Sequence, residues 1–150
     1  MEKPLAESDK PKIRIDPAAE FRSGDLLRIE VDSPSQLNYL YVAYVQADGS
    51  VVNLVQPSGL VPKPTLPNSR LIFGDGMDGR QRFTISPPFG REMIVALASR
   101  SPMFDNALPV VQTEREYLSA LRRALVFKPA PGMPDREVSA SMQLLQTRER

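Results

Sequence analysis

Hydrophobic and polar residues alternate along much of this chain with the two-residue period of β-strands. The clearest stretch is YLYVAYVQADGSVVNL, residues 39–54, in which two apolar runs are separated by Asp48-Gly49. An Asp-Gly pair between two such runs is a strong local signal for a β-hairpin. The pattern therefore predicts a hairpin in the middle of a buried sheet.

The turn fixes the predicted register of this hairpin. A type I′ turn needs a positive φ at both turn residues and matches the twist of the strands. A two-residue Asp-Gly loop of this type pairs Val45 with Val52 and Ala43 with Leu54. Both faces of the hairpin are then largely apolar, which predicts interior strands that are covered on two sides.

Shorter patterns predict further strands and one helix. The predicted strands cover residues 12–16, 25–32, 70–73, 81–86, 92–99 and 138–144. Thr113 and Glu116 form a capping box that begins a helix, which ends before Pro129. The apolar stripe of this helix consists of Tyr117, Leu118, Leu121, Ala124 and Leu125. For the tail at 136–148, a second helix capped by Asp135 is the alternative to a strand.

These elements favour a mainly β fold, an immunoglobulin-like β-sandwich of about seven short strands with one covering α-helix near the C-terminus. The 150 residues suit a single domain with one core. We assign that domain to residues 12–150 and interpret the charged, proline-containing residues 1–11 as a linker. Fifteen prolines against eight glycines also favour short strands and stiff loops.

The amino-acid composition limits the kinds of catalytic and metal-binding site that the chain can form. The chain has neither cysteine nor histidine, so it lacks thiolate metal ligands, a cysteine nucleophile and the usual general base near neutral pH. We therefore expect no enzyme activity and no cofactor. The formal charge of +1 gives no broad field for nucleic acid, and no apolar run reaches the ~20 residues that a membrane-spanning helix needs.

Three segments carry a family resemblance. They are FRSGDLLRIEV (21–31), NYLYVAYVQADGSVVNLVQPSG (38–59) and RFTISPPFGREMIVALASRSPMF (82–104). In this order they resemble the uncharacterised accessory domain found downstream of bacterial caspase-like peptidase domains and in some bacterial protein kinases and envelope proteins. The resemblance implies that any caspase-like chemistry belongs to another, N-terminal domain, because the His and Cys of that dyad are absent here.

The leading hypothesis is accordingly a non-catalytic accessory domain of a larger bacterial caspase-like peptidase. It would recognise a protein partner or position the parent's own catalytic domain. An envelope-associated structural or ligand-binding module without a peptidase is the alternative, and a small carboxylate-based or Ser/Lys hydrolase is the third. The sequence assigns neither an oligomeric state nor a compartment.

Two loops are candidate sites. In Gly74–Gly79, the carboxylates of Asp75 and Asp78 among glycines suggest a calcium ligand set, but a plain hairpin turn is the favoured interpretation. The proline-rich run with Pro62, Pro64 and Pro67 suggests a docking segment, with a stiff loop as the simpler alternative.

Three further groups come from the predicted strands and helix. Tyr44 is the hairpin tyrosine expected to expose its hydroxyl to a partner, although cross-strand packing is favoured for such aromatic residues. Arg122 and Arg123 suggest a docking face for an acidic partner, or simply cations near a helix C-terminus. Arg91-Glu92 and Asp25 are a possible acid–base set, for which solvated strand ends or a structural ion pair are the favoured interpretation.

Overall fold

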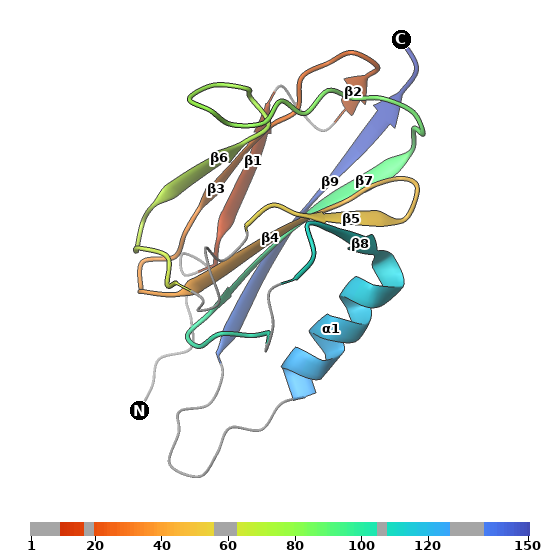
Figure 1. Cartoon of the computed structure of the whole chain (residues 1–150). Coiled ribbons are helices and arrows are strands. Elements are labelled where there is room, and N and C mark those ends of the chain that lie inside the picture. Colours follow the sequence, from red (N-terminus) through yellow and green to blue (C-terminus); the bar gives the residue numbers. More distant parts are fainter. Residues whose placement is uncertain (1–9, 17–19, 56–62, 105–107, 127–136) are drawn as a thin grey trace, which may run out of the picture.

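The computed structural model describes residues 10–16, 20–55, 63–104, 108–126 and 137–150. These residues form nine strands and one helix, arranged as two sheets that face each other (Figure 1). The fold is therefore mainly β and consistent with the predicted β-sandwich, with the helix near the C-terminus. The elements are β1 (Lys12–Asp16), β2 (Glu20–Arg22), β3 (Arg28–Asp32), β4 (Tyr39–Val45), β5 (Ser50–Asn53), β6 (Arg70–Phe73), β7 (Arg91–Ser99), β8 (Val111–Thr113), α1 (Glu114–Val126) and β9 (Val138–Arg148).

One sheet is small and the other is large. The three-stranded sheet has the order β1-β3-β6, and the six-stranded sheet has the order β2-β9-β7-β4-β5-β8. All pairings are antiparallel except that of β2 with β9. The prediction of about seven strands missed β2 and β8, each only three residues long.

The main core lies between the two sheets. In β3, Ile29 and Val31 are fully buried while Arg28 and Glu30 are partly exposed, as the period-two pattern predicts. They pack in one cluster with inward-facing residues of β4 and β7, including Val42 and Ile94. Burying a side chain of this size contributes about 1.5–3 kcal/mol to the free energy of unfolding.

The helix covers the other face of the large sheet. Tyr117 packs with Ala43 and Val51, and Ala124 packs with Val95. The central strands are thus covered on both sides, which confirms the prediction drawn from their two apolar faces. Within the described residues, no helix combines the length and apolar character needed to span a bilayer.

The capping box at the start of α1 is confirmed. The Glu116 backbone N–H donates to Thr113 Oγ1 at 3.1 Å, and the Glu116 carboxylate accepts from the Thr113 backbone N–H at 3.4 Å. The apolar stripe is narrower than predicted. Leu118 and Leu125 are 53% and 56% exposed, because the sheet contacts only the side of the helix that carries Tyr117 and Ala124.

The predicted hairpin register is wrong by one residue. Val45 pairs with Val51 and Ala43 pairs with Asn53, rather than with Val52 and Leu54. The loop has three residues, and of these only Gly49 has a positive φ. The Asp48 carboxylate instead accepts a hydrogen bond from the Ser50 backbone N–H at 2.9 Å. This is the three-residue alternative to a type I′ turn.

The shift changes which residues of β5 share a face with β4. Val52 now faces the main core with Tyr44, while Val51 and the buried Asn53 face the helix side. Asn53 is satisfied there by the Pro109 carbonyl and by the side chain of Gln112.

Other strand predictions hold with local changes. The strand predicted at 25–32 begins at Arg28, and the tail is a strand, Val138–Arg148, rather than a helix. Residues 81–86 are not a regular strand. The Phe83 N–H donates to the Gly74 carbonyl, while the Phe83 carbonyl accepts from Leu27, so this segment is shared between two neighbours.

Gly74 gives a test of the packing at the end of β6. Its φ is +88°, and an alanine Cβ there would lie 2.2 Å from the Leu27 carbonyl oxygen and 2.6 Å from Phe83 Cδ2. We expect Gly74→Ala to lower the free energy of unfolding, measured by urea denaturation, by about 3 kcal/mol or more.

Gly79 is the matched control, since its φ is +80° and a Cβ there meets nothing within 4 Å. Gly79→Ala should cost only the backbone strain, about 1–2 kcal/mol. Equal losses in the two variants would contradict the close packing at Gly74.

Candidate functional site

The large sheet holds a buried polar pair, Tyr44 and Glu92. Tyr44 lies on β4 and Glu92 near the start of β7, and their exposed fractions are only 6% and 7%. Because Tyr44 is opposite Ile94, Glu92 lies diagonally across the strand pair on the same face. The Tyr44 hydroxyl donates a hydrogen bond to Glu92 Oε1, and the Ala47 backbone N–H donates to Oε2 at 3.0 Å.

The expectation that Tyr44 exposes its hydroxyl is therefore wrong. The corrected register brings Val52 beside Tyr44, and Phe83 packs near its ring, with centroids 6.5 Å apart. Burial, followed by the hydrogen bond to Glu92 and the negative charge of that carboxylate, raises the pKa of Tyr44 above its ordinary value. The hydroxyl thus serves as a permanent hydrogen-bond donor.

The pair lines a cavity of about 300 Å³ on the inner side of the large sheet. Its other walls include Leu27, Phe83 and Ile85. Glu92 is the single carboxylate among the described residues that line it. Acid–base hydrolysis by paired carboxylates needs a second one at close range. The cavity therefore offers one carboxylate that is already engaged by two donors.

The other member of the suspected acid–base set has different partners. The Asp25 carboxylate accepts from the Arg22 backbone N–H at 2.7 Å and pairs with Arg150. Glu92 is held by Tyr44 and Ala47 instead. Asp25 thus has the ion pair that the sequence favoured, whereas Glu92 is buried and held by two neutral donors.

The Gly74–Gly79 loop is organised by an ion pair. Asp75 accepts hydrogen bonds from Arg80 Nε at 2.8 Å and Nη2 at 2.7 Å, and these hold the pKa of its carboxyl well below the ordinary value. Asp78 and Gly79 both have a positive φ, as a type I′ turn requires. Among the described residues, no group of three or more His, Cys, Asp or Glu side chains is placed to hold a metal ion.

The remaining candidate residues lie on two different sides of the sandwich. Pro64 and Pro67 are exposed in the segment that leads into β6 of the small sheet, and Pro62 lies outside the described residues. Arg122 and Arg123 are exposed on α1, which covers the outer face of the large sheet (Figure 1). The structure does not bring these two groups together.

Sequence reasoning missed the pairing of Tyr44 with Glu92. The sequence did contain a signal for it, because Glu92 begins the apolar run EMIVALAS. A carboxylate buried in such a strand needs hydrogen-bond donors from a neighbouring strand. The donor was missed because the pairing of β4 with β7, which brings Tyr44 to Glu92, was not predicted.

These features define a two-sheet β domain with one covering helix, in which the buried carboxylate is used for structure. Residues 20–102 match the sequence model of the family described as Domain of unknown function (DUF4384), and the chain belongs to this family. The matched segment runs from β2 to just beyond β7. Searches of curated proteins and of solved structures return no match.

Removing the Tyr44 hydroxyl tests the buried pair. Tyr44→Phe leaves Glu92 Oε1 without its donor, so the free energy of unfolding should fall by about 2 kcal/mol in denaturant titrations. In a double-mutant cycle with Glu92→Ala, which removes the acceptor, we expect a coupling energy of about 1 kcal/mol or more. Purely additive losses would show that the two side chains do not interact.

Because Tyr117 is buried, we expect the free energy of unfolding to fall in alkali. In the unfolded chain its hydroxyl ionises near pH 10, whereas burial in the fold raises the pKa of Tyr117 to about 12. Between these values the unfolded chain binds fewer protons, so the free energy of unfolding falls as pH rises. The contribution is fully present below pH 10 and is lost as the pH approaches about 12.

The measurement compares Tyr117→Phe with the parent chain by urea denaturation at pH 9 and at about pH 11.5. The variant cannot ionise at this position, so its stability should decline less between the two pH values. Parallel declines would contradict the assignment.

Proposed function

We propose that this chain is a non-catalytic accessory domain that binds protein. In the finer form of this proposal, it belongs to a larger bacterial protein with a caspase-like peptidase domain. It either recognises a protein partner or positions that peptidase domain. Membership of the DUF4384 family is compatible with this first statement. The stronger support comes from the exposed side of α1.

That side of the helix carries a mixed basic and apolar stripe. Arg115, Leu118, Arg122 and Leu125 follow one another at intervals of three or four residues, so they lie along one side of the helix. All four are exposed, and both leucines are more than half exposed. A mixed stripe of this kind suits the apolar, arginine-rich contacts of protein interfaces. This stripe is the observation that carries the proposal.

The nature of the partner follows from the charge of the stripe. Two arginines beside two leucines complement a surface with carboxylates around an apolar patch. The caspase-like parent is suggested by the three sequence segments at 21–31, 38–59 and 82–104. Because this chain has no histidine or cysteine, peptidase chemistry would reside in the other domain.

The direct experiment combines this domain with the parent's peptidase domain. Both are purified separately, and binding is measured by crosslinking and by titration calorimetry. We expect a complex, and a change in peptidase activity when residues 12–150 are deleted from the full protein. No complex together with unchanged activity would overturn the proposal.

A surface variant connects the binding to the stripe. Leu118→Gln removes an apolar contact at a helical site and should weaken the complex by roughly fivefold, about 1 kcal/mol. Leu37→Gln is the control, since Leu37 has nearly the same exposure, 54% against 53%, and lies on a loop far along the chain. Equal effects of the two variants would remove α1 from the interface.

A further inference from the structure

The cavity beside Tyr44 and Glu92 contains a negative charge that the described residues do not pair with a cation. Glu92 is only 7% exposed and lines this cavity of about 300 Å³. Its carboxylate is held by two neutral donors, the Tyr44 hydroxyl and the Ala47 backbone N–H. None of the ion pairs among the described residues includes Glu92. A buried carboxylate is costly unless a cation lies beside it, so the cavity favours a positively charged ligand.

Two arginines lie near Glu92 in the sequence or at the cavity, and neither supplies this cation. Arg91 precedes Glu92 on β7, where successive side chains point to opposite faces, so Arg91 belongs to the outer face of the sheet. Arg82 borders the cavity, but it is exposed and lies beside Gly76, where a Cβ would be 3.4 Å from Arg82 Nε. Water screens an exposed charge of this kind far more than it screens the buried carboxylate.

Glu92 still has acceptor sites for a ligand. The two oxygens of a carboxylate offer about four lone-pair sites. The Tyr44 hydroxyl and the Ala47 N–H use one site on each oxygen. A metal ion such as Ca²⁺ needs several oxygen ligands, and Glu92 is the single carboxylate among the described residues that line the cavity. An ammonium group needs only acceptors and one opposite charge, so it suits this site better than a metal ion does.

The walls of the cavity select the rest of the ligand. Tyr44 and Phe83 both line it, with ring centroids 6.5 Å apart, and organic cations are favoured beside aromatic rings. Val52 and Val111 are directly opposite each other in the pairing of β5 with β8, and both line the cavity. Val111 is 59% exposed, so an alkyl chain that packs against it would remove apolar surface from water.

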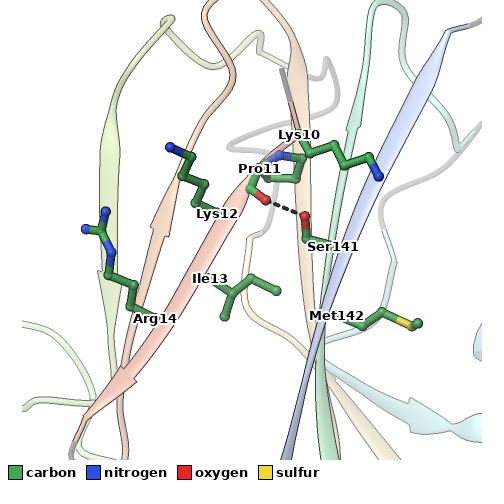
Figure 2. A pocket seen from close by; sticks show the side chains of 7 residues that line it. All are labelled: Lys10, Pro11, Lys12, Ile13, Arg14, Ser141 and Met142. Carbon is green, nitrogen blue, oxygen red and sulfur yellow. Dashed lines mark hydrogen bonds between the residues drawn. The ribbon is translucent and has the colours of Figure 1, made fainter. Parts of the chain in front are cut away.

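A larger groove in the described part of the chain lacks this combination of features. It has a volume of about 610 Å³ and lies between β1 and β9 (Figure 2). Its Lys12 and Arg14 are exposed and point away from β9, and Arg14 pairs with Asp32 at 3.3 Å. Among the described residues that line it, no charged side chain is buried. This groove therefore does not select a ligand by charge.

We propose that the Glu92 cavity binds a small alkylammonium compound. Its N–H groups donate to the Glu92 carboxylate, and its alkyl chain packs against Val52, Phe83 and Val111. The cavity volume lies at the lower end of the range for small-molecule sites, roughly 300–1,000 Å³. This site is on the inner side of the large sheet, whereas α1 covers the outer face. The inference therefore goes beyond the proposed protein-binding function and does not depend on it.

The test titrates the full chain with n-pentylamine, which stays protonated at pH 7 as a lysine side chain does. Backbone amide signals are followed by NMR. We expect shifts centred on Val52, Phe83 and Val111, with a Kd of roughly 1–10 mM for a ligand of this size. The matched probe is n-pentanol, which keeps the alkyl chain but has no charge. It should bind at least about fivefold more weakly, because a charge-assisted hydrogen bond is stronger than a neutral one.

A pair of variants assigns the preference for the amine to one carboxylate. Glu92→Gln keeps the shape of the side chain and removes its charge, so the two probes should bind within about twofold of each other. Glu149→Gln is the control, since Glu149 is an exposed residue that does not line the cavity, and it should leave the preference for the amine unchanged. If Glu92→Gln does not fold, the comparison of the two probes on the parent chain still decides the result.

Three outcomes would overturn the inference. The first is equal binding of n-pentylamine and n-pentanol to the parent chain. The second is a set of amide shifts that excludes Val52, Phe83 and Val111. The third comes from a blocked tripeptide with a central lysine. If it binds about threefold or more tighter than n-pentylamine, the cavity receives the lysine side chain of a partner protein rather than a free compound.

Discussion

The structure depends on the burial of β4 and β7 from both faces. These strands form the centre of the large sheet, with the small sheet on one side and α1 on the other. Neither cover is sufficient alone: removing the helix would expose Ala43, Val51 and Val95 to water, and removing the small sheet would expose Val42 and Ile94. A sheet with two apolar faces is thus stable only as the middle layer of a sandwich.

This burial explains why a polar side chain near the central strands needs hydrogen-bond partners within the domain. Glu92 sits at the end of a strand that is otherwise almost entirely buried, where an unpaired carboxylate would be costly. It is retained with a tyrosine hydroxyl and a backbone N–H as donors. A carboxylate held in this way joins the β4–β5 loop to the start of β7, so its first consequence is structural.

The layered fold was predictable because it follows from period-two alternation. β1 and β6 match the predicted ranges, and the capping box at Thr113 locates the start of α1. The one-residue slip in the hairpin arose because Asp-Gly suits either a two-residue loop or a three-residue loop, and local sequence does not distinguish them. That slip placed Asn53 beside Tyr44 and so suggested an exposed hydroxyl, and the β4–β7 pairing that brings Glu92 to Tyr44 was not predicted. The three-residue β2 and β8 carry too little pattern to be recognised, since they are defined by their neighbours.

Strand β9 shows what the alternation of apolar and polar residues predicts about an exposed surface and what it leaves open. Alternation in VSASMQL correctly predicts a strand, but alternation alone does not reveal which face is covered. Here β7 aligns Leu145 and Thr147 with the core, and the pleat then places Met142 and Leu144 outside. The register that turns Leu145 and Thr147 inward therefore turns the apolar side chains of Met142 and Leu144 to the outer face. Among the residues that the structure describes, this row stays exposed, because α1 lies over other strands of the same face.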